Sequence, residues 1–151
     1  MKLFQIEEPD GSPADPDAPG AAVGIDATGR LAEVGFAVGG NAVIFADREG
    51  YQRDIPVPPL DAPTDSWREL FEWTRIRAER NLGRPVTHAV LGLARQPDEA
   101  AIAILKGAAA AAGLELLMVV RCGTLDRAAA GSPALTLASL AEDTAPRPQN
   151  L

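Results

Sequence analysis

The feature that most constrains this chain is a short apolar run ending in one acidic residue, at residues 21–30 (Ala-Ala-Val-Gly-Ile-Asp-Ala-Thr-Gly-Arg). Apolar side chains on both faces are typical of a strand buried inside a sheet, so the run predicts a strand over residues 21–27. Asp26 marks the point where the chain leaves the core. A carboxylate at a strand end beside a Gly turn can hold a metal–phosphate group, but Asp, Thr and Gly also favour turns for conformational reasons alone. The sequence alone therefore leaves both interpretations of Asp26 open, a ligand-binding carboxylate and a turn residue.

Two more apolar segments follow at residues 31–38 and 42–46, and the Gly-Gly-Asn sequence between them predicts a β-hairpin. Residues 51–57 are predicted to be extended. The prolines that come next end regular structure, because proline lacks a backbone N–H donor. Three strands in succession therefore open the domain.

The second half of the chain alternates between helix and strand patterns. A helix is predicted to begin at Ser66, where Ser-Trp-Arg-Glu has the form of a capping box, and to end at Gly83. Four arginines are interpreted as the solvated face of this helix: Arg75, Arg77, Arg80 and Arg84.

Two apolar runs, residues 86–93 and 114–120, predict the fourth and fifth strands, and the fifth is typical of a fully buried parallel strand. The helix between them is predicted to begin near Asp98 and to be capped by Gly113. Shorter helical segments are predicted at residues 124–130 and 133–140.

This order of elements predicts an α/β fold. A three-strand meander followed by β-α-β units builds a five-stranded mixed sheet with helices on its faces, the architecture of ribonuclease H and of each half of an actin-like ATPase. We expect one such lobe over residues 21–141. A flexible leader at residues 1–20, rich in proline and aspartate, precedes it, and a flexible tail at residues 142–151 follows.

Ligands of open α/β sheets bind at the carboxyl ends of the strands. Here those ends carry Asp26, with Thr28 and Gly29 in the turn after it, and Arg121. These four residues are the candidate cofactor-binding site. No catalytic residue or metal ligand is assigned, and the single histidine, His88, is interpreted as solvent-facing or hydrogen-bonded.

Charge and cysteine content narrow the range of partners. The net charge of −7 disfavours nucleic acid, because a phosphate backbone would repel the chain. The single cysteine, Cys122, excludes an internal disulfide and is typical of a reducing compartment, and it is predicted to pack as a small apolar residue. No apolar run reaches the length of a membrane span. We expect a cytoplasmic protein with no membrane partner.

Five segments of the sequence point to one family. Residues 3–9 (Leu-Phe-Gln-Ile-Glu-Glu-Pro), residues 23–26 (Val-Gly-Ile-Asp) and residues 47–53, 82–90 and 108–115 resemble the seventy-kilodalton heat-shock chaperones of the DnaK type. The likeness is greatest to the HscA branch, which acts in iron–sulfur cluster assembly, and it spans about residues 1–54 and 66–131. The resemblance implies one nucleotide-binding lobe of an actin-like ATPase.

Departures from the family pattern decide which activity the resemblance implies. Asp26 is kept, but Ala-Thr-Gly-Arg at residues 27–30 replaces the family's Leu-Gly-Thr-Thr loop, and Cys122 stands where the family has an acidic residue. The segment carrying the family's catalytic lysine is mostly missing, and neither Lys2 nor Lys106 can fill that role. Losing one such group typically costs about a hundred- to a thousand-fold in rate. ATP hydrolysis is therefore not expected.

We expect a degenerate chaperone relative that acts as a non-catalytic interaction module in chaperone function or iron–sulfur assembly. Its partner would be a co-chaperone, an iron–sulfur scaffold, a complementary lobe or a second copy in a homodimer. Residual ATP or phosphate binding, with Mg²⁺, at Asp26, Thr28, Gly29 and Arg121 is one alternative. A ribonuclease-H-type nuclease is a more distant one, since two-metal cleavage needs clustered carboxylates and the sequence offers only Asp26 and Asp126.

Overall fold

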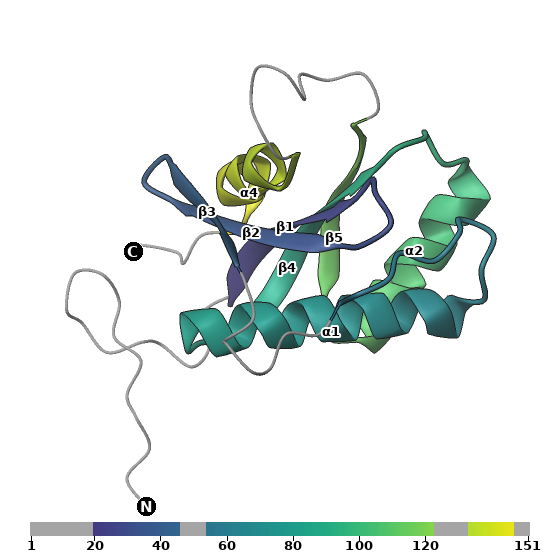
Figure 1. Cartoon of the computed structure of the whole chain (residues 1–151), viewed down its shortest axis with the longest axis horizontal. Coiled ribbons are helices and arrows are strands. Elements are labelled where there is room, and N and C mark those ends of the chain that lie inside the picture. Colours follow the sequence, from purple (N-terminus) through teal and green to yellow (C-terminus); the bar gives the residue numbers. More distant parts are fainter. Residues whose placement is uncertain (1–19, 46–53, 123–132, 147–151) are drawn as a thin grey trace, which may run out of the picture.

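A computed structural model describes residues 20–45, 54–122 and 133–146. One mixed sheet has the order β3-β2-β1-β4-β5. Its strands are β1 (Ala21–Ala27), β2 (Glu33–Val38), β3 (Asn41–Phe45), β4 (Val86–Leu93) and β5 (Glu115–Arg121). The pairs β1–β2 and β2–β3 are antiparallel, and β1–β4 and β4–β5 are parallel. Helices α1 (Thr64–Leu82) and α2 (Glu99–Ala111) lie on one face of the sheet, and α4 (Pro133–Thr144) lies on the other (Figure 1).

The predicted α/β fold with a five-stranded mixed sheet is confirmed. Every residue of β1 is buried, because α4 packs on one face of this central strand and the other face belongs to the core that α1 covers. The hairpin turn lies at Gly39 and Gly40, whose φ values of 60° and 84° are those of a left-handed turn that glycine adopts without strain. The extended conformation of residues 54–57 is held by a hydrogen bond from the N–H of Ala32 to the carbonyl of Ile55, 2.8 Å long.

The start of α1 differs from the sequence prediction. The helix begins at Thr64 after Pro63, with no side-chain cap, so the capping box at Ser66 is wrong. Pro63 has the extended backbone that precedes a helix, and its carbonyl already accepts the N–H of Ser66, 3.0 Å away. The predicted end is confirmed, since Gly83 adopts φ 68° and donates to the carbonyl of Glu79.

Arg75 is not part of a solvated face. Its side chain is only 27% exposed and pairs with Glu79 at 2.8 Å. Its Nε also donates to the carbonyl of Ala112, 2.8 Å away, just after the end of α2. A cation there satisfies a carbonyl that the helix leaves without a partner, so Arg75 ties α1 to α2.

The edge strand β5 also differs from expectation. It was predicted to be fully buried, but it is half exposed because no strand of the described residues pairs with its outer side, and Met118 is 38% exposed. Several predicted segments lie outside the described residues: the helix at 124–130, nearly all of the leader at 1–20, residue 46 of the third strand, residues 51–53 of the extended segment and residues 147–151 of the tail.

Helix α4 is longer than predicted and lies unusually close to the sheet. It continues to Thr144, so residues 142–144, which the sequence assigned to the tail, belong to the helix. Three glycines on adjacent strands allow this approach: Gly35 on β2, Gly24 on β1 and Gly92 on β4. A Cβ added at Gly24 would overlap the backbone of Leu137 and Ala138, and one at Gly35 would lie 2.7 Å from the carbonyl oxygen of Ala134.

This packing predicts opposite effects for two glycine substitutions. Gly24→Ala should lower the free energy of unfolding by about 1–3 kcal/mol, because the helix backbone must move away from the new methyl group. Gly107→Ala is the matched control, since Gly107 is exposed in α2 with nothing within 4 Å of an added Cβ. It should raise the stability by about 0.5–1 kcal/mol. Urea denaturation measures both, and a neutral Gly24→Ala would contradict the packing of α4.

Candidate functional site

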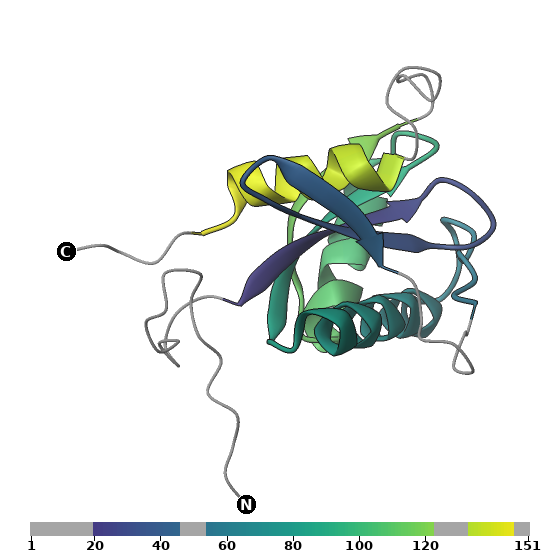
Figure 2. The ribbon, with the colours of Figure 1, turned by 60° about the vertical axis from the view of Figure 1, so that its left-hand side comes forward.

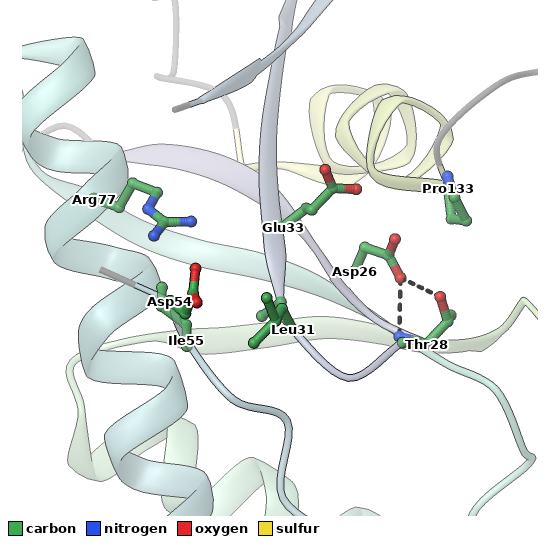
Figure 3. Close-up of a pocket in the computed structure, with 10 residues that line it drawn as sticks. Asp26, Thr28, Leu31, Glu33, Asp54, Ile55, Arg77 and Pro133 are labelled. Atoms are coloured by element: carbon green, nitrogen blue, oxygen red, sulfur yellow. Dashed lines mark hydrogen bonds between the residues drawn. The ribbon is translucent and has the colours of Figure 1, made fainter. Parts of the chain in front are cut away.

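A pocket of ≈ 520 Å³ opens at the carboxyl end of β1 (Figure 3). It is formed by the end of β1, the turn into β2, the extended residues after β3 and one residue each from α1 and α4. The lining residues are Asp26, Thr28, Gly29, Leu31, Ala32, Glu33, Asp54, Ile55, Arg77 and Pro133. Three of the four predicted site residues, Asp26, Thr28 and Gly29, are therefore brought together.

Asp26 is held by its own turn. Its side chain lies on the face of the sheet that α4 covers, since Val23 and Ile25 pack in the core on the α1 side and residues alternate along a strand. The residue is 6% exposed, and its Oδ1 accepts the backbone N–H of Thr28 at 2.9 Å and the Thr28 hydroxyl at 2.6 Å. This is the arrangement in which an aspartate stabilises a turn two residues on. The conformational interpretation of Asp26 accounts for both contacts.

The other charged residues of the pocket were missed by sequence reasoning. Glu33 is the register partner of Asp26 across the antiparallel β1–β2 pair, so the two carboxylates share one face of the sheet. Asp54 and Arg77 lie on the other side of the pocket, with Leu31 and Glu33 between them and Asp26 (Figure 3). Among the described residues, three carboxylates and one guanidinium give the lining a formal charge of −2.

No local pattern signals these residues. The pairing of Glu33 with Asp26 depends on the length of the β1–β2 loop, and Arg77 reaches the pocket only through the position of α1 on the sheet. Arg77 was predicted to belong to a solvated face, but it is half-buried and lines the pocket.

Arg121 does not line this pocket. It ends β5 and pairs with Leu93 of β4, which in turn pairs with Ala27 of β1, so a whole strand separates it from the Asp26 turn. Arg95, which follows β4, is exposed and is also not among the lining residues.

The lining fits a magnesium nucleotide poorly. Phosphates need backbone N–H groups or cations that converge on them, and here carboxylates outnumber the cation three to one. Among the described residues, no buried side-chain nitrogen or oxygen lacks a hydrogen-bond partner, so no orphaned polar atom awaits a ligand. Within the same residues, no three His, Cys, Asp or Glu side chains lie together as a metal site would require.

Two minor sequence predictions are confirmed. His88 is hydrogen-bonded, with Nδ1 2.7 Å from the Thr87 hydroxyl and Nε2 3.8 Å from a carboxylate oxygen of Glu115. Cys122 is buried and packs with Leu137 and Val90 in the smaller core beneath α4.

Comparison with known proteins leaves the family open. No protein-family model matches the chain, and no curated protein is significantly similar to it in sequence. None of the helices in the described part of the chain is long and apolar enough to cross a membrane.

The turn at Asp26 predicts a difference between two substitutions. Asp26→Ala removes the acceptor of both Thr28 bonds and should lower the unfolding free energy by about 1–3 kcal/mol. Asp26→Asn keeps an oxygen at that position and removes a negative charge beside Glu33, so its stability should stay within about 1 kcal/mol of wild type. Urea denaturation compares them. Equal destabilisation of both variants would mean that the negative charge itself is needed, as it would be for holding a cation.

Proposed function

We propose that this chain is a degenerate relative of the DnaK-type chaperones, with the fold of one actin-like ATPase lobe, and that it works as a non-catalytic interaction module. The strand order β3-β2-β1-β4-β5 supports this lobe, because it joins an antiparallel meander to parallel β-α-β units around a central β1. The position of Asp26 at the carboxyl end of β1 supports the resemblance to the family's first phosphate loop.

The proposal rests on the contacts that the carboxylate of Asp26 makes. In the resembled family this carboxylate serves the metal–phosphate group. Here the carboxylate accepts the N–H and the hydroxyl of Thr28 in the same turn, and its register partner on β2 is another acid, Glu33. A pair of carboxylates on one face repels a phosphate. The fold pattern is kept while the phosphate site is not, which supports binding of a protein in place of catalysis.

The expected losses in the rate of ATP hydrolysis favour the same conclusion. Phosphoryl transfer depends on positioning and charge neutralisation, and each missing group costs about 10²–10³ in rate. Arg77 is the cation among the described lining residues, and Lys106 lies on the exposed side of α2. A chain lacking several of these groups has no useful ATPase rate.

Residual binding of ATP or phosphate is the second candidate, and one observation favours it. Arg77 lines the pocket together with Thr28 and Gly29, as a cation and a small turn would in an anion site. The three carboxylates work against it. A ribonuclease-H-type nuclease has less support, because the end of β4 leads into Ala94 and Arg95 without a carboxylate.

Isothermal titration of the full chain tests the proposal in two arms. Titration with MgATP should give no saturable heat up to about 1 mM, a limit that corresponds to about −4 kcal/mol of binding. Titration with the purified co-chaperone and iron–sulfur scaffold of the native cell should give saturable binding that MgATP does not change.

Arg77→Ala is the control variant. If the wild-type chain bound MgATP with micromolar affinity and Arg77→Ala abolished that binding, the nucleotide-binding alternative would replace the proposal. Absence of binding to both proteins would remove the link to iron–sulfur assembly.

A further inference from the structure

The two edges of the sheet differ in how they are protected. Natural sheets block edge-to-edge association with charged residues or with irregularities in the strand. The β5 edge has both, since Glu115 and Arg121 stand at its ends and its pairing with β4 shifts register between Ala89 and Val90. The β5 edge is therefore poorly suited to pairing with another strand.

The β3 edge has neither charged residues nor an irregularity in its pairing. Residues 34–45 contain no charged side chain, although the chain as a whole is 23% charged, and the β2–β3 pairing is regular throughout. Val43 is 54% exposed and Ile44 is 37% exposed, so apolar side chains stand open on both faces of this strand. β3 is the outermost strand on this side of the sheet, and in Figure 2 none of the helices in the described residues lies beyond that edge.

The hairpin geometry fixes which backbone groups face outward. A turn with positive φ at both Gly39 and Gly40 joins Val38 and Asn41 as a hydrogen-bonded pair. Hydrogen-bonded and non-bonded pairs alternate from there, so the N–H and C=O groups of Ala42 and Ile44 point away from β2. These are the groups that a further strand would pair with.

We propose that β3 pairs antiparallel with β3 of a second copy of this chain, about a two-fold axis at Val43, to form a continuous ten-stranded sheet. In this register Ala42 of each copy lies opposite Ile44 of the other, and each such pair exchanges both backbone hydrogen bonds through the outward-facing groups. Val43 lies opposite Val43 of the second copy as a close, non-hydrogen-bonded pair.

A second copy fits this edge better than a charged partner does. Each copy carries a net charge of −7, and β3 carries no charged side chain of its own, so two copies can pair along it without opposing like charges on the paired strands. A basic partner would find no acidic side chain on residues 34–45. The pairing covers the exposed apolar side chains of β3, and an isologous contact needs only this one strand.

The edge is also held in place before association. Glu142 of α4 accepts the backbone N–H groups of Gly39 at 2.6 Å and of Gly40 at 3.3 Å, which fixes the tip of the hairpin to the helix above it. Phe36 and Phe45 stack with their ring centroids 6.3 Å apart and stiffen the pair of strands from the other face. A preorganised edge loses little freedom on binding.

The dimer should be weak. A strand of five residues is about 17 Å long, and such a contact buries less than a standard interface. We expect a Kd on the order of 100 µM. The proposal does not depend on the partner binding proposed above, because it can fail or succeed whether or not a chaperone partner binds.

Sedimentation velocity of the full chain from about 10 µM to 1 mM tests the proposal, because that range brackets the expected Kd. Wild type should shift from monomer to dimer across it. Val43→Lys places two cations opposite each other, and Ile44→Pro removes an outward N–H, so each should weaken dimerisation at least about tenfold. Far-UV circular dichroism checks that both variants keep the fold.

Val38→Lys is the matched control. Val38 is 55% exposed on the same face as Val43 but lies on β2, so this variant should dimerise like wild type. A wild-type chain that stays monomeric to about 1 mM would overturn the proposal. Dimerisation that survives Val43→Lys, or that is lost in Met118→Lys on the β5 edge, would also overturn it.

Discussion

The contact between α4 and three glycines is the constraint on which the rest of the structure depends. Because Gly35 and Gly24 carry no Cβ, the backbone of α4 lies directly on β2 and β1, and Gly92 leaves room on β4 for the side chain of Leu137. The sheet-facing residues of the helix include Ala134 and Ala138, both fully buried, so the approach leaves no gap. This layer buries the second face of β1 and positions the start of α4 beside Asp26. It also anchors the hairpin through Glu142. One packing arrangement thus shapes both the pocket and the exposed edge.

The pocket and the β3 edge differ in charge. In the pocket, Asp26 is buried and its carboxylate is used within its own turn, while Glu33 and Asp54 add negative charge that Arg77 offsets only in part. At the edge, β3 presents backbone groups and apolar side chains without charge. The first arrangement is unsuited to phosphates, and the second is suited to main-chain pairing. Both features support the non-catalytic interaction module that we propose.

Much of the fold could be predicted from local sequence patterns. Apolar runs predict the bounds of β1 and β4. Glycine predicts the turn at Gly39 and Gly40 and the end of α1 at Gly83. The predictions that were wrong concern residues whose surroundings depend on contacts between segments distant in the sequence. Arg75 looks solvated on a helical wheel, yet it bonds the carbonyl of Ala112 across two helices. The buried character predicted for β5 overlooked its place at the sheet edge. In the site, Asp26, Thr28 and Gly29 are adjacent in sequence and were found, whereas Glu33, Asp54 and Arg77 reach the pocket only through the fold.

The carboxylate of Asp26 is engaged by Thr28, and we propose that it does not serve a metal–phosphate group. A crystal structure of the chain grown with MgATP in excess tests this most directly. We expect Oδ1 of Asp26 within hydrogen-bond distance of the Thr28 N–H and hydroxyl, in a sheet ordered β3-β2-β1-β4-β5, with no nucleotide at the turn. An adenine nucleotide whose phosphates or metal are coordinated at Asp26 would contradict it, as would a different strand order.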